Sequence, residues 1–227
     1  MAASTQTKGD CAYCGHETTR GHMARHLAAC PARRKAVAIA DATLGPATTF
    51  VHLQVQDAVS GEYWLHLEVD GTATLKQIDT YLRAIWLECC GHLSKFSTGG
   101  WRGHDVGMAR KVASVFGPGV ELEHTYDYGT SSVTHLKTVA TRQGRRTGKR
   151  PIALMARNHP LAYPCQECGA PAAYLCMECV YEDDAAGMLC AKHRENHPHE
   201  EYGGPTELVN SPRIGMCGYE GPAEPPY

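Results

Sequence analysis

The sequence lacks the features that would place the protein in a membrane or a secretory pathway or give it a strongly charged surface. No run of about 18 apolar residues is present that could span a bilayer. The N-terminal segment, residues 1–10, has no apolar stretch of the kind that a secretory signal needs. The formal net charge is only −2, so attraction to nucleic acid or an anionic membrane would need a local patch. We therefore expect a cytoplasmic protein with no membrane association.

The composition is that of a globular protein, with 43% hydrophobic and 20% charged residues among 227. This length suits a medium-sized domain with small appendages. The sequence also contains 11 cysteines. Because thiols in the cytoplasm are kept reduced, closely spaced cysteine pairs there are more often metal ligands than disulfides.

Cysteines gather near the two ends of the chain and leave a middle with regular hydrophobic periodicity. We expect four segments on this basis. They are a zinc finger at 1–36, a mixed domain at 46–158, a second zinc module at 159–202 and an irregular tail at 203–227. Cys89 and Cys90 lie apart from both clusters, and we expect them to be small buried residues at the end of a helix.

The middle segment predicts an α+β fold, in which helices pack on one face of an antiparallel sheet. Apolar and polar residues alternate in four stretches, which is typical of strands with one buried face. A capping box formed by Thr74 and Gln77 begins a helix between the second and third of them. We expect a second helix at 108–116 and loops at 97–107 and 143–150. The four predicted strands are 49–57, 62–69, 120–128 and 133–141.

The middle segment also resembles the plasmid Ri ORF-three-like family, a domain of unknown function, over residues 48–158. The resemblance depends on the hairpin that ends at 63–69, the helix start at Thr74, the segment 92–96 and the motif 126–129. In many members two acidic residues and a tryptophan follow that motif, whereas Thr130, Ser131 and Ser132 follow it here. The resemblance implies a fold and names no activity.

The N-terminal cluster has the spacing of a C2HC-type zinc finger, formed by Cys11, Cys14, His26 and Cys30. A Cys-x2-Cys turn presents two sulfur atoms, and residues four apart on a helix lie on one face, so the two pairs can complete a tetrahedron. His22 lies one helical turn before His26 and is a competing ligand, although a solvated histidine is the simpler interpretation.

The C-terminal cluster supplies eight candidate ligands in a segment too short to fold on an apolar core alone. It resembles a B-box or another cross-brace module, in which the first and third ligand pairs bind one zinc and the second and fourth bind another. This resemblance assigns the first site to Cys165, Cys168, Cys190 and His193. It assigns the second site to Cys176, Cys179, His197 and His199. Cys217 competes for the last place, and a single zinc or a redox dithiol are alternatives.

About three Zn²⁺ per chain would therefore be structural, because four ligands leave no open position for a catalytic water. The leading hypothesis is a non-enzymatic protein that uses zinc modules to bind a macromolecular partner. The alternatives are a protein–protein adaptor of B-box type and an enzyme with a polar pocket near residues 126–129. In the enzyme, His124, Asp127 and His135 would have to converge.

Two basic runs are candidate phosphate contacts for a nucleic-acid partner: Arg33, Arg34 and Lys35, and the segment Arg142–Arg150. Solvated loops are the simpler interpretation of each run. The segment 210–219 is expected to dock back onto the middle domain, without any chemistry that the sequence assigns to it.

Overall fold

The computed structural model describes residues 7–221 and 226 of the chain. The chain divides into two compact units. The first unit takes in residues up to 82 and residues 93–159, and the second takes in residues 83–92 and 160–225. No helix in the described part of the chain combines the length and the apolar character that crossing a membrane requires.

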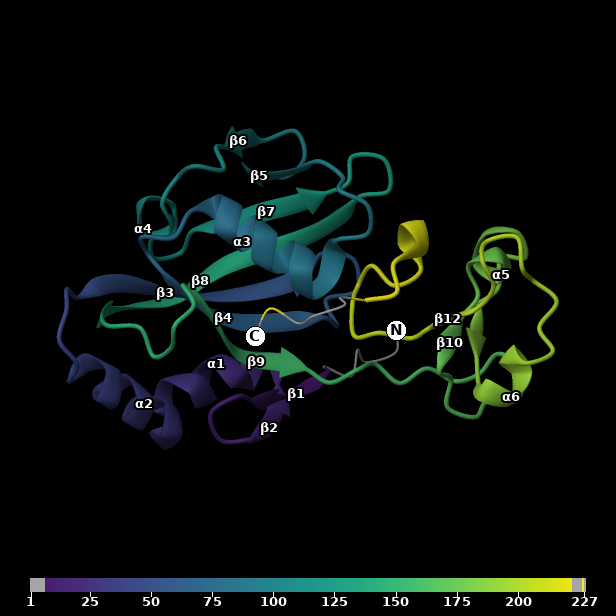
Figure 1. Ribbon diagram of the computed structural model, residues 1–227, viewed down its shortest axis with the longest axis horizontal. Coiled ribbons are helices and arrows are strands. Elements are labelled where there is room, and N and C mark those ends of the chain that lie inside the picture. Colours follow the sequence, from purple (N-terminus) through teal and green to yellow (C-terminus); the bar gives the residue numbers. More distant parts are fainter. Residues whose placement is uncertain (1–6, 222–225, 227) are drawn as a thin grey trace. The chain divides into compact units, whose positions relative to one another are not determined.

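The first unit is built on an antiparallel sheet of nine strands in the order β2-β1-β9-β4-β3-β8-β7-β5-β6 (Figure 1). The strands β3 and β4 form a hairpin at its centre, and β8 pairs with the other side of β3. The strands are β1 (Lys8–Cys11), β2 (Glu17–Thr19), β3 (Thr48–Asp57), β4 (Trp64–Asp70), β5 (Ser94–Thr98), β6 (His104–Val106), β7 (Glu121–Tyr126), β8 (Ser132–Gly144) and β9 (Ile152–Asn158).

The helices of the first unit, among the residues that the structure describes, are α1 (Arg20–Ala29), α2 (Pro31–Asp41), α3 (Leu75–Leu82) and α4 (Val112–Val115). Figure 1 shows α3 lying across the sheet. Asp79 of α3 bonds to His124 of β7, and the strand register places His124 on the same face as Val55 and Leu65. The helix α3 therefore covers the apolar face that the alternation predicts.

The opposite face of the sheet is covered as well, because every residue of β4 is buried. Trp64, His66 and Glu68 alternate on this face. Met23 and Leu27 of α1 pack with Trp64, and Arg33 of α2 bonds to Glu68 at 2.8 Å. The N-terminal helices thus bury a row of side chains that includes a carboxylate and a histidine.

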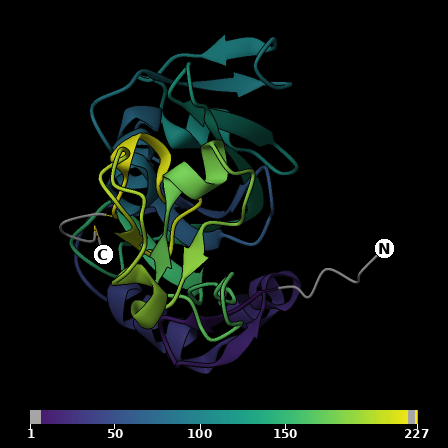
Figure 2. The same cartoon turned by 90° about the vertical axis from the view of Figure 1, so that its right-hand side faces the viewer.

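Within the described residues, the second unit contains a sheet of three short strands in the order β11-β10-β12 and four short helical segments. Its residues 160–221 are drawn in green to yellow in Figure 2. Its strands are β10 (Tyr174–Leu175), β11 (Met188–Leu189) and β12 (Thr206–Glu207). Its helices are α5 (Met177–Tyr181), α6 (Ala191–Arg194), the π-helix η1 (Arg83–Leu87) and the 3₁₀-helix η2 (Met216–Gly218).

The predicted fold class is confirmed: a large antiparallel sheet is combined with a few helices and with clusters of cysteine and histidine. The capping box forms, since Thr74 N donates to Gln77 Oε1 and Gln77 N to Thr74 Oγ1. The predicted loop at 97–107 is wrong in part, because β5 and β6 form a hairpin there. The helix predicted at 108–116 shortens to α4.

Among the elements of the first unit that were not predicted, α2 and β9 are the longest. Pro31 ends α1 as expected but also begins α2, since proline is favoured in the first turn of a helix. The strand β9 lies between β1 and β4, where both of its faces are partly covered, so it shows no simple alternation. Through β9 the predicted finger segment joins the main sheet, and Gly9 allows β1 to approach the backbone of Arg157 closely.

Glu68 forms the most buried ion pairs of this face, with side-chain exposures of 3% for Glu68, 15% for Arg33 and 17% for Arg142. Burial alone would raise the pKa of Glu68, but hydrogen bonds from Arg142 and Arg33 outweigh it and lower that pKa. The carboxylate stays charged and joins α2 to β8.

We predict that Glu68→Gln destabilises the protein by about 3 kcal/mol, because two partly buried guanidinium groups would then face an uncharged amide. Urea unfolding followed by tryptophan fluorescence measures the change. The control is Glu17→Gln, which breaks an exposed pair with Lys8 and should cost less than about 1 kcal/mol. If the two substitutions destabilised the protein equally, the conclusion that Glu68 forms stabilising buried ion pairs would be wrong.

A second polar pair lies on the same face, where His52 Nε2 and His66 Nδ1 are 2.8 Å apart and both side chains are buried. The register shifts beside each of them, between His52 and Leu53 and between His66 and Leu67. Burial lowers the pKa of His66 to about 4, and burial together with His66 lowers that of His52 to about 2.

These shifts predict that stability falls as the pH is lowered from about 6.5, the ordinary histidine pKa, towards 4. In that window the unfolded chain binds protons that the folded pair excludes, so the free energy of unfolding rises with pH by about 1.4 kcal/mol per unit for each proton. The double variant His52→Gln/His66→Gln should have a shallower slope than the wild type in urea titrations. Replacement of the exposed His104 by Gln should keep the wild-type dependence of the free energy of unfolding on pH. If the wild type and both variants had the same dependence, His52 and His66 would not be its cause.

Candidate metal centres

The N-terminal candidate centre is formed where β1, α1 and the start of α2 meet. Cys11 ends β1, and Gly15, with a φ of 68°, turns the chain so that its N–H donates to Cys11 O. His26 lies on α1, and Cys30 separates α1 from α2. The ligand atoms of Cys11, Cys14, His26 and Cys30 all lie within 4.8 Å of one another.

The distances within this group suit tetrahedral coordination. Zinc at its usual bond lengths holds two sulfur ligands about 3.8 Å apart and a sulfur and a nitrogen about 3.6 Å apart. Cys14 Sγ lies 3.7 Å from Cys30 Sγ and 3.4 Å from His26 Nε2. Four side-chain donors therefore surround a space of the right size for one metal ion.

The competing ligand His22 lies outside this group. Its Nδ1 is 3.2 Å from Thr19 Oγ1 at the exposed start of α1, so the structure brings His26 and not His22 to the cysteines. The ring of His16 stacks on His26 with centroids 4.4 Å apart. Burial lowers the pKa of His26, and the nearby His16 ring lowers it further. The lower pKa favours the neutral imidazole that a metal requires.

The C-terminal unit contains two interleaved groups, each with ligand atoms within 4.8 Å of one another. The first and third ligand pairs of the sequence come together, and so do the second and fourth, which is the arrangement of a cross-brace. One group is Cys165, Cys168, Cys190 and His193, and the other is Cys176, Cys179, His197 and His199.

Short turns and helix starts position these ligands. Gly169, with a φ of 71°, closes the turn after Cys168 just as Gly15 does after Cys14. Cys176 and Cys190 immediately precede α5 and α6, and Cys179 N donates to Cys176 Sγ at 3.5 Å. Backbone N–H groups aimed at sulfur favour the thiolate, which is the form that binds a metal.

The electrostatics of Cys165 show this preference. Burial acts to raise its pKa, but N–H groups of the backbone at Cys190, Glu167 and Cys168 and the side chain of His193 lower it to about 6. Sulfur and nitrogen distances in this group are 3.5 Å from Cys165 to His193 and 3.3 Å from Cys190 to His193. Cys168 Sγ lies 3.9 Å from Cys190 Sγ.

His197 and His199 reach one point although a single residue separates them, because they use different ring nitrogens. His197 Nε2 and His199 Nδ1 each lie 3.3 Å from Cys179 Sγ, and the two rings are nearly perpendicular. His199 Nε2 then faces Asp183 and Glu178, at 3.6 Å and 3.9 Å. Carboxylates on the outer nitrogen of a histidine commonly orient it towards a metal.

Cys217 does not compete with His199 for this group. It lies in a fourth group with Cys89, Cys90 and His92. The expectation that both middle cysteines are buried is wrong, since Cys90 is exposed and Cys89 is half-buried. Spacing rules missed this group because Cys217 is 127 positions from Cys90.

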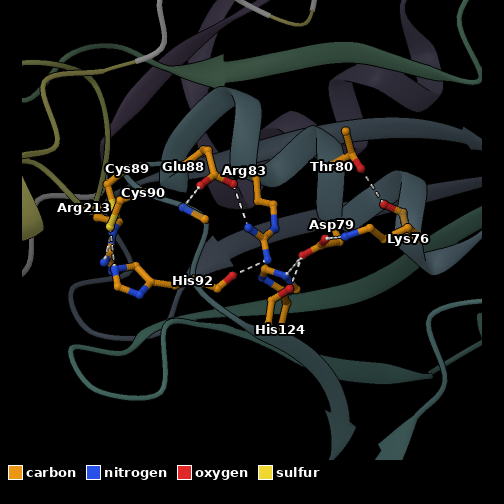
Figure 3. Close-up of polar contacts among 12 residues, drawn as sticks. Lys76, Asp79, Thr80, Arg83, Glu88, Cys89, Cys90, His92, His124 and Arg213 are labelled. Atoms are coloured by element: carbon orange, nitrogen blue, oxygen red, sulfur yellow. Dashed lines mark hydrogen bonds and ion pairs between the residues drawn. The ribbon is translucent and has the colours of Figure 1, made fainter.

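The residues of the enzyme alternative do not converge. His124 is completely buried and donates to Asp79 (Figure 3), which also accepts from Ser94 and Lys76. Burial would raise the pKa of Asp79, but these three hydrogen bonds lower it. Since His124 pairs with Thr134 across the strands, His135 extends from the opposite face and contacts Glu123, while Asp127 accepts from Gly129 N in a turn.

Several cations of the basic runs already have partners within the first unit. Arg33 and Arg142 bond to Glu68, Arg145 to the backbone of Asp41 and Gly45, and Arg146 to Asp70. Carboxylates of the fold thus neutralise Arg33, Arg142 and Arg146, and backbone carbonyl groups accept hydrogen bonds from Arg145. The exposed members of the two runs include Arg34, Lys35, Lys149 and Arg150.

Comparisons with known proteins give no family for the chain. No protein-family model matches it, and no curated protein matches it. Among solved structures, a protein of unknown function, MM3350 from Methanosarcina mazei Go1, is similar to 48% of this chain and 69% of its own, with 17% identity and a TM-score of 0.41.

We predict that His26→Ala lowers the zinc content by one ion per chain, whereas His22→Ala leaves it unchanged. The reason is that His26 Nε2 faces the sulfur atoms and His22 faces Thr19. Both histidines lie on α1, so the pair is matched. Elemental analysis of the purified variants measures the difference, and loss of zinc from His22→Ala alone would reverse the assignment.

Proposed function

We propose that the protein is a non-catalytic zinc protein whose zinc modules present a surface to a macromolecular partner. The observation that carries the proposal is that the three groups at the two ends each offer four side-chain donors. Thiolate and imidazole are the ligands that Zn²⁺ prefers, and four of them close its coordination sphere. Zinc would hold the fold at these points and activate no water there.

A protein is the better-supported partner, because the C-terminal unit is acidic and exposes aromatic rings. Tyr181 and Tyr202 are about half exposed, and their ring centroids lie 6.1 Å apart. Tyrosine is enriched at protein interfaces. Between residues 160 and 204 only Lys192 and Arg194 are basic, whereas the acidic residues are Glu167, Glu178, Glu182, Asp183, Asp184, Glu195, Glu200 and Glu201. Such a surface repels phosphate groups, which favours an adaptor of B-box type.

Nucleic acid as the partner would depend on the exposed remainder of the basic runs. Arg34, Lys35, Lys149 and Arg150 are cations that could contact phosphates without breaking an ion pair with a carboxylate of the fold.

We also propose that the middle segment is a member of the plasmid Ri ORF-three-like family. The hairpin β3–β4 followed by α3 supports that proposal, which concerns the fold and adds no activity.

Metal analysis tests the zinc proposal on the full chain purified with a thiol reductant. We expect at least three zinc ions per chain, and fewer than two would refute it. In the Co²⁺-substituted protein the absorption bands of tetrahedral thiolate sites should not change when azide is added, because closed sites have no position for an exogenous ligand. A change on adding azide would indicate an open, catalytic type of site.

Binding of the nuclease-treated protein to mixed-sequence DNA and RNA separates the two kinds of partner. For a protein that binds proteins we expect no salt-dependent affinity. Salt-dependent binding that Lys149→Ala/Arg150→Ala weakens would instead establish the nucleic-acid version. The control for that outcome is Lys192→Ala, which removes a cation from the acidic C-terminal unit.

A further inference from the structure

The fourth group, Cys89, Cys90, His92 and Cys217, has the geometry of a metal site in its own right. Cys90 Sγ lies 3.7 Å from Cys89 Sγ, 3.4 Å from Cys217 Sγ and 3.0 Å from His92 Nε2. His92 Nε2 lies 3.4 Å from Cys217 Sγ. The separations of 3.4 and 3.7 Å are close to the roughly 3.6 to 3.8 Å that a tetrahedral zinc imposes, the contact of Cys90 with His92 is shorter, and all four ligand atoms lie within 4.8 Å of one another, as in the other three groups.

Two irregular backbone segments bring these side chains together. The π-helix η1 ends at Leu87, and Gly91, with a φ of 81°, turns the chain so that His92 comes back beside Cys90. Cys217 has a φ of 53° and lies between Gly215 and Gly218, which also have positive φ. A residue other than glycine in this conformation is strained, and such strain persists where the surrounding structure demands it.

A buried cation lies beside the group (Figure 3). Arg213 is completely buried, and its Nη2 donates to Cys89 Sγ at 3.4 Å. Three thiolates and one neutral imidazole around Zn²⁺ carry a single net negative charge, so a guanidinium at their edge is electrostatically favourable. The buried Ser211 donates to Trp86 O at 2.7 Å and fastens the same two segments at a second point.

The distribution of cysteine supports the same assignment. The four groups take up all 11 cysteines of the sequence, and each group is completed to four donors by histidine. A chain that used only the three end groups would leave Cys89, Cys90 and Cys217 in sulfur contact without a use. Cys90 and Cys217 are exposed, and exposed thiols at such distances are prone to oxidation, from which a bound metal would protect them.

We propose that Cys89, Cys90, His92 and Cys217 form a fourth structural Zn²⁺ site. Binding would release the three thiol protons to solvent and would connect residues 127 positions apart in the chain. Closing so long a loop removes many conformations from the unfolded chain, so this site would hold the segment 210–219 in place. The proposal is separate from the proposed function, which three zinc ions satisfy.

Native mass spectrometry of the full chain, purified with a thiol reductant, tests the fourth site by counting zinc ions in each folded species. We expect four for the wild type and three for Cys217→Ser and for His92→Ala. The matched control His22→Ala should keep four. A wild type with three ions, or variants that lose none, would overturn the proposal without affecting the other three centres.

Limited proteolysis keeps the test decisive if a variant folds poorly. Trypsin cleaves after arginine, and the buried Arg213 should resist cleavage in the wild type but become a cleavage site in Cys217→Ser. The fragment that ends at Arg213 should meanwhile keep three zinc ions. A disulfide between Cys90 and Cys217 in the reductant-purified wild type, detected as a mass two hydrogens lower with blocked alkylation, would also overturn the proposal.

Discussion

The convergence of sulfur and imidazole ligands is the constraint on which the zinc module of the second unit, residues 160–202, depends. The apolar cluster within the zinc module consists of Cys176, Cys179 and Leu189, with Tyr174 and Ala185 packed against it. So small a core cannot offset the conformational entropy of a segment of this length. The interleaved ligand pairs add a further restriction. The first two ligands of the second site, Cys176 and Cys179, lie between Cys168 and Cys190 of the first site, so closing the first site restricts the segment that carries them.

The N-terminal centre has a different physical role, since its ligands lie on a larger core. Cys11 and Cys30 are buried together with Met23, Leu27, Trp64 and Met155, and β1 is hydrogen-bonded to β9 of the main sheet. Packing and backbone pairing already place this segment. A zinc ion there would orient α1 and fix the junction with α2, from which Arg33 reaches Glu68.

Local patterns in the sequence predicted the central hairpin, the capped start of α3 and the two end clusters, because each depends on residues close together in the chain. The alternation in β3 and the pair Thr74 and Gln77 are of this kind. The sequence did not predict α2 or β9, since proline was taken only as a helix end and β9 has no single exposed face. It also missed the fourth group, because no spacing rule relates Cys90 to Cys217. Contacts between distant parts of the chain depend on tertiary packing, which periodicity cannot show.

The charges of the fold explain why basic runs are poor guides to a partner in this protein. Arg33, Arg142 and Arg146 lie in arginine-rich stretches, yet each is paired with a carboxylate of the β-sheet. Bound zinc would shift the balance further, because a site with three cysteines would turn neutral thiols into thiolates and add more negative charge than the metal supplies. The protein with bound metal is thus more acidic than the formal charge of −2. A partner that approaches the C-terminal unit meets tyrosine rings and carboxylates, which suit a basic protein surface better than a phosphate backbone.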